Sequence, residues 1–66
     1  MNVKKSMRIA MAHSGINQRQ LAMASGLSEV TISTINNGKA SPSMATITKL
    51  ATATGFSFVD FINLGE

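Results

Sequence analysis

The residues that could carry covalent or metal chemistry are few in this chain and lie far apart. It contains one histidine, His13, no cysteine, and three acidic residues, Glu29, Asp60 and Glu66. Nucleophilic and acid–base catalysis need a reactive side chain with a partner beside it, and a zinc site needs about four ligands. This spacing supplies no such group, so we expect neither an enzyme nor a bound metal or other cofactor.

The balance of charge favours a polyanionic partner. Charged residues make up 14% of the 66 residues, and six basic against three acidic side chains give a net charge of +3. A basic excess suits an anionic polymer, although alone it is weak support. The lack of cysteine fits a reducing, intracellular compartment. Arg8 and His13 interrupt the apolar N-terminal stretch, so we expect neither a signal peptide nor a membrane span.

The stretch 17–39 has the start and stop residues of two short helices joined by a tight turn. Asn17 with Gln20 forms a capping-box pattern, which predicts the start of a helix. Gly26 supplies the left-handed position that commonly ends a helix. Ser28 is a suitable N-cap for a second helix directly after the turn.

The second segment, 29–36, could also be a β-strand. Its VTISTI run is mostly β-branched, and the Asn37-Gly38 that follows is a common hairpin turn. A hairpin needs a second strand, but the residues after the turn, KASPS, do not alternate and contain a proline. As a helix, the segment places Leu27, Ile32 and Ile35 close to one side. We therefore predict a helix.

The rest of the chain predicts three further helices. Over 3–13 and 42–54, apolar residues recur at helical spacing. Ser41-Pro42 is predicted to start the second of these, because proline suits the first helical position. Ser57 with Asp60 marks the start of a short last helix. The predicted inward residues of these helices are Val3, Met7, Ala10, Met11, Met44, Ile47, Leu50, Ala51, Phe56, Phe61 and Ile62.

Together these residues resemble a known family. The segment GINQRQLAMASGLSEVTISTINNGK, the proline-started helix after it and LATATGFSF are similar to the helix-turn-helix domain of phage Cro and repressor proteins and of xenobiotic-response-element-type regulators. The resemblance covers about residues 7–62, and its most specific residues are Gln18, Leu21-Ala22, Gly26, Ser28, Ile32 and Asn37-Gly38-Lys39. It implies an all-α, compact five-helix fold like that of lambda repressor. Residues 1–66 would form a single domain, with the helix-turn-helix motif as helices two and three over about 17–39.

The resemblance also implies which residues meet double-stranded DNA. In the family, the second helix of the motif enters the major groove. The positions that would read bases are Ser28, Glu29, Val30, Thr31 and Thr34. Those that would bind the sugar-phosphate chain, through side-chain or backbone donors, are Gln18, Arg19, Asn37, Gly38 and Lys39. Carboxylates, methyl groups and hydroxyls are all able to make such contacts. The alternative is a solvated helix face without a ligand.

The sequence departs from the family in two places. Many members have an arginine where Met11 stands and an acid where Asn36 stands, and the two form a pair between the first and third helices. That pair is absent here, and an apolar or weakly polar contact avoids the desolvation cost of buried charges. Glu29 stands where the family often has an amide or small residue. It either reads a cytosine or points away from the phosphates.

The apolar C-terminal region leaves two functions open. Phe58, Val59 and Leu64 add more apolar side chains than one inward face holds, which predicts a contact surface. A homodimer, formed in solution or only on DNA, would supply the second half-site of a palindromic operator. The lack of a sensor domain favours a Cro-like repressor, in the cytoplasm of a bacterium or a phage-infected cell. The rival is an antitoxin-like or other protein-binding module with the same fold.

Overall fold

Each helix of the protein begins at a side chain that accepts a hydrogen bond from the backbone of its own first turn. The computed structural model describes residues 2–66. These residues form five helices and no strand: α1 (Val3–Ser14), α2 (Gln18–Ser25), α3 (Glu29–Asn36), α4 (Met44–Thr54) and α5 (Phe58–Asn63). The N-caps are Asn2, Asn17, Ser28, Ser43 and Ser57, and each accepts from the N–H group three residues further on. A cap of this kind stabilises a helix by about 1 kcal/mol.

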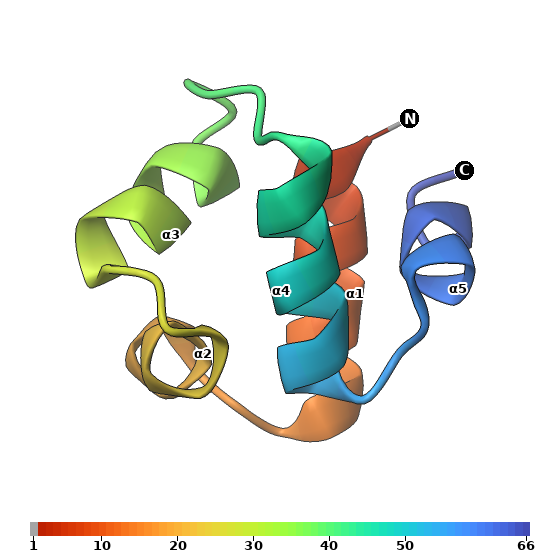
Figure 1. Cartoon of the computed structure of the whole chain (residues 1–66), viewed down its shortest axis with the longest axis horizontal. Helices are drawn as coiled ribbons and strands as arrows, with labels where there is room; N and C mark the ends of the chain where they lie inside the picture. The colour runs from red at the N-terminus through yellow and green to blue at the C-terminus, as the bar shows by residue number, and fades with distance from the viewer. Residues whose placement is uncertain (1) are drawn as a thin grey trace.

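The helices are arranged around a central pair. α1 and α4 lie side by side, with α2 and α3 on one side of them and α5 on the other (Figure 1). α4 packs against α1, α2 and α5, whereas α3 packs against α1 and α2. The predicted all-α, five-helix fold is confirmed, and the strand alternative for 29–36 is wrong. No helix within residues 2–66 is long and apolar enough to cross a membrane.

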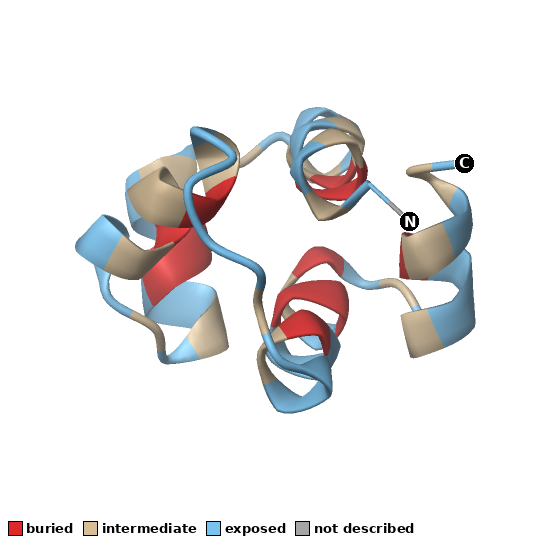
Figure 2. Cartoon of the chain, turned by 90° about the horizontal axis from the view of Figure 1, so that it is seen from above, coloured by how far each residue is buried: buried red, intermediate tan, exposed pale blue. Residues whose placement is uncertain are grey.

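One core joins all the helices, whose buried faces point inward (Figure 2). The spacing predicted for the first three helices is confirmed, because their inward residues lie in this core or pack against its rim. The buried apolar residues are Met7, Ala10, Leu21, Ala22, Ile32, Ile35, Ile47, Leu50, Ala51 and Phe61. Gly26, at φ 77°, allows α2 to turn directly toward the N-cap of α3.

The start of α4 differs from the prediction. Ser43, not Ser41, is the N-cap, and its Oγ accepts from the N–H of Thr46 at 3.3 Å. Pro42 therefore precedes the helix instead of opening it. Met44, predicted to face inward, is 71% exposed. It is the first residue of α4, and helical side chains lean toward the N-terminus, so its side chain extends past the end of the core.

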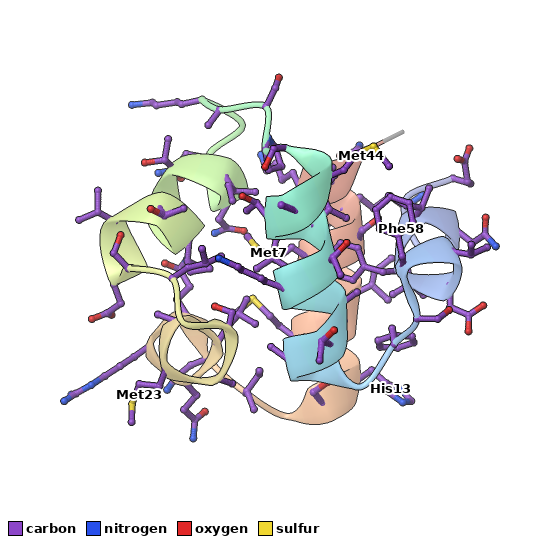
Figure 3. The ribbon with its side chains drawn as sticks, viewed as in Figure 1. Met7, His13, Met23, Met44 and Phe58 are labelled. Atoms are coloured by element: carbon purple, nitrogen blue, oxygen red, sulfur yellow. The ribbon has the colours of Figure 1, made fainter. Side chains whose placement is uncertain are left out.

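α5 carries the three residues predicted to form an apolar contact surface, and they differ in exposure. Phe58 and Leu64 are only partly exposed and pack against the core. Phe58 lies on the side of α5 that faces α4 (Figure 3). Val59 remains 64% exposed. Of the three residues predicted to form a contact surface, only Val59 presents most of its side chain to the outside.

The last residues of the chain pack on the first turns of α1. A Cβ added at Gly65 would overlap the carbonyl oxygen of Asn2 and the hydroxyl of Ser6. Ser6 is fully buried, and its Oγ has no hydrogen-bond partner among residues 2–66. The Lys5 ammonium donates to the carbonyl oxygen of Glu66 at 3.3 Å. Residues 2–6 and 64–66 are thus held together at one edge of the molecule.

We predict that Ile32→Ala lowers the free energy of unfolding by about 2–4 kcal/mol, because it removes a fully buried side chain and leaves a cavity. The matched control is Val30→Ala in the same helix. Val30 is 75% exposed, so this change should alter stability by less than about 0.5 kcal/mol. Urea denaturation followed by circular dichroism measures both, and equal losses would contradict the orientation of α3.

Candidate nucleic-acid interface

The outward face of α3 is free of core contacts. Its buried residues are Ile32 and Ile35. Glu29 and Val30 are exposed, and Thr34 is partly exposed one turn further along. The period of the helix therefore separates residues that hold α3 in place from residues that a ligand can reach.

Ser28 and Thr31 share their hydrogen bonds at the start of α3. The Ser28 Oγ accepts from the N–H of Thr31 at 3.1 Å, and the two hydroxyl oxygens lie 2.9 Å apart. One hydroxyl proton is used between them, whichever side chain donates it. The other proton remains available. The pair can therefore cap the helix and still offer one hydroxyl donor to a ligand.

Thr34 is constrained by a hydrogen bond within its own helix. Its Oγ1 donates to the carbonyl oxygen of Val30 at 2.7 Å. This bond uses the hydroxyl proton and leaves the oxygen lone pairs and the methyl group. Toward a base edge, Thr34 can thus accept from an amino group or contact a thymine methyl, but it has no proton to donate.

A surface hollow joins the start of α2 to the outward face of α3. Its volume is about 440 Å³, and its lining residues are Gln18, Glu29, Val30, Ser33 and Thr34. The structure thus brings together one predicted phosphate-binding residue and three predicted base readers. Ser33 was missed in the sequence, although its i+3 and i+4 spacing from Val30 and Glu29 places it on the same face.

The first turn of α2 leaves two backbone donors unused by its caps. The Asn17 side chain accepts from the N–H of Gln20 at 2.8 Å, and the Gln20 side chain accepts from the N–H of Asn17 at 2.9 Å. The predicted capping box is confirmed. A helix start has four N–H groups without helical partners, so those of Gln18 and Arg19 remain. They can bind an anion, which the helix dipole also favours.

The turn after α3, residues 37–39, uses its backbone donors within the protein. The N–H groups of Asn37, Gly38 and Lys39 donate to the carbonyl oxygens of Ser33, Ile35 and Thr34 at 2.9, 3.0 and 3.0 Å. Gly38 has no side chain, so no donor is left there for a phosphate. Its φ of 71° instead closes the helix in the left-handed conformation that glycine favours. The side chains of Asn37 and Lys39 are exposed and remain available.

Comparison with known families identifies this arrangement. The model of the helix-turn-helix family HTH_3, the Cro and C1 repressor type, matches residues 7–61. The chain belongs to this family. A search of curated proteins found no match to it. As a helix-turn-helix protein it is a regulator that binds double-stranded DNA, and domains of this family are typically not enzymes.

In this helix-turn-helix protein, uncharged residues occupy the two positions between α1 and α3 where many family members have an ion pair. Met11 is partly buried and packs against the core, and Asn36, the last residue of α3, is also partly buried. Neither side chain is charged. The two helices therefore meet without the desolvation cost of a buried ion pair.

Proposed function

We propose that the protein is a sequence-specific repressor that binds a palindromic operator as a homodimer, with α3 of each protomer in the major groove. The observation that carries this proposal is the hollow shared by Gln18 and the outward side chains of α3. It sets the anion-binding end of α2 beside unburied hydroxyl, carboxylate and methyl groups. DNA presents the matching pattern, since phosphates border the base edges of its grooves.

The size and position of α3 suit this groove. A helix with its side chains is about 10–12 Å wide, and the major groove of B-DNA is about 12 Å wide. α3 has 8 residues, which corresponds to a length of about 12 Å. It lies at the edge of the molecule, on the side opposite α5 (Figure 1). Its first turn would point toward the bases, as in other helix-turn-helix proteins.

The outward residues would read bases through different groups. Val30 offers methyl groups to a thymine, and Thr34 offers either a methyl group or an acceptor. The spare hydroxyl proton of Ser28 and Thr31 is a donor for a base or a phosphate. Glu29 would accept from the amino group of a cytosine. Glu29 also stabilises α3 on its own, because it stands in the first turn, at the positive end of the helix dipole.

Phosphate contacts would hold α3 from both ends. Gln18 and Arg19 offer backbone N–H groups at the start of α2, and Arg19 adds an exposed cation. Asn37 and Lys39 offer side chains just beyond the end of α3. Contacts to the backbone carry no sequence information themselves, but they fix the register in which the reading residues meet the bases.

The exposed side of α5 would carry the dimer contact. Val59 is 64% exposed there, with the partly exposed Phe58 and Leu64 near it in sequence. α5 and α3 lie on opposite sides of the central helix pair, so a contact at α5 leaves α3 free (Figure 1). The same exposed apolar side chain favours the second candidate function, an antitoxin-like or other protein-binding module.

We expect the logarithm of the association constant on duplex DNA to fall linearly with the logarithm of salt concentration, by about 0.9 for each phosphate neutralised. Fluorescence anisotropy on a duplex selected from random sequences measures this between about 50 and 200 mM salt. A palindromic consensus from the selection would support the dimeric operator. Absent or salt-independent binding would overturn the DNA-binding proposal and favour the protein-binding module.

Thr34→Ala should alter sequence preference at one base-pair position and remove about 1 kcal/mol of discrimination there. Thr34→Ser keeps the acceptor and removes the methyl group, so it separates the two proposed contacts. Lys39→Ala should instead weaken binding to all sequences alike and reduce the salt slope. Selected-site profiles and salt titrations measure these effects. A profile unchanged by Thr34→Ala would remove Thr34 from the reading residues.

Val59→Asp should weaken self-association, because it places a charge in the proposed apolar contact. Met23→Asp is the matched control, since Met23 is 78% exposed on α2 and projects away from the body of the molecule (Figure 3). Sedimentation velocity, with and without operator DNA, measures the oligomeric state. If both variants sediment like the wild-type protein, the dimer contact does not lie at Val59.

A further inference from the structure

Three basic residues, Lys4, Lys5 and Arg8, lie on the first two turns of α1. The family match begins only at residue 7, so it assigns no role to the two lysines. They are adjacent in sequence and line one surface hollow with Asn2 and Arg8, but each also has a neighbour of its own. Lys4 lies beside the turn that follows α3, at the edge of the proposed DNA surface, whereas Lys5 contacts the C-terminal end of the chain.

Lys4 lies against the turn that follows α3. Its Cδ is 3.9 Å from the point that a Cβ of Gly38 would occupy. Lys4 and Gly38 also line a surface hollow of about 350 Å³, together with Ile35, Ala40 and Ser41. Lys4 is exposed. The hydrocarbon stem of a lysine can rest on such a surface while its ammonium stays in water.

Lys5 makes its hydrogen bond with the C-terminal end of the chain. Its ammonium donates to the carbonyl oxygen of Glu66 at 3.3 Å, and the residue is partly buried. Gly65, next to this partner, packs on the same turns of α1. Lys5 thus has a role inside the fold, and it is not among the residues that line the hollow beside Gly38.

The positive charge of Lys4 lies near two helix ends of opposite polarity. Lys4 is in the first turn of α1, and that turn contains no acidic residue. The N-terminal end of a helix dipole is positive, so a cation there is unfavourable. The Lys4 stem also lies beside Gly38, just past the C-terminal end of α3, where a cation is favourable, so the two effects oppose each other. A negatively charged partner beside the turn would add an attraction that the first turn of α1 does not supply.

We propose that Lys4 binds a phosphate of the operator backbone, next to the phosphate bound by Lys39. This inference rests on the proposed function and extends the DNA contact from the helix-turn-helix motif to α1. Because the stem of Lys4 already lies beside Gly38, little side-chain freedom would be lost on binding. In a dimer, the contact would occur once in each half-site.

The test compares Lys4→Ala with Lys5→Ala, which removes the same charge from the neighbouring position. Binding to the operator selected with the wild-type protein is measured by anisotropy over a salt series. We expect Lys4→Ala to weaken binding at least about fivefold and to reduce the salt slope by about 0.9 per protomer. Lys5→Ala should leave the slope unchanged. Lys4→Arg, which keeps the charge, should restore binding.

Phosphate ethylation interference on the same operator locates the contact. One interfering phosphate, adjacent to that lost in Lys39→Ala, should disappear in Lys4→Ala and persist in Lys5→Ala. Thermal unfolding separates binding from folding. The midpoint of Lys4→Ala should lie close to that of the wild-type protein, because the exposed charge is unfavourable at the start of α1 and favourable at the end of α3.

The outcomes distinguish the two proposals. If the wild-type protein binds and Lys39→Ala weakens it, but Lys4→Ala does not, the Lys4 contact is wrong and the proposed function stands. The inference would be overturned if Lys4→Ala and Lys5→Ala had equal effects and no phosphate was lost from the interference pattern. Lys4 would then contribute only long-range electrostatic attraction to DNA. No binding by the wild-type protein would overturn both proposals.

Discussion

The packing of Ile32 and Ile35 against the rest of the protein is the interaction on which an exposed α3 depends. The sequence of this helix, EVTISTIN, is mostly β-branched or polar, and such residues are poor helix formers. A helix of 8 residues is also too short to persist on local propensity alone. The two isoleucines supply the tertiary contact, while Ser28 and Gly38 close the two ends. These groups hold the backbone of α3 in place, which the proposed contact with bases requires.

Most helix ends could be predicted because a cap is made between residues close in sequence. The Asn17–Gln20 box and the Ser28 cap depend on residue types three positions apart, and both are present in the structure. The start of α4 could not be placed in this way. Ser41 and Ser43 flank the same proline, and each is an acceptable cap. In the structure Ser43 is the cap, and its Oγ meets both the N–H and the hydroxyl of Thr46.

Some features of the candidate site could not be predicted from the sequence. They depend on contacts between residues far apart in the chain, or on hydrogen bonds that the folded protein already forms. Residue types suggested Gly38 as a backbone donor, but its N–H is used by the carbonyl oxygen of Ile35. Phe58 and Leu64 were assigned to a contact surface from their apolar type, and the structure shows that part of each side chain also packs against the core. Lys4 lies beside Gly38 only because α1 crosses the end of α3. Spacing along one helix cannot reveal such a neighbour.

The separation of inward and outward residues on α3 has an evolutionary consequence. Residues such as Val30 and Thr34 contribute little to the core, while Ile32 and Ile35 contribute nothing to the exposed face. If the outer face reads DNA as proposed, substitutions on it change the recognised sequence at small cost to folding. A regulator and its target can diverge together by single steps, each of which leaves a folded protein. One small scaffold can in this way serve many different control sequences.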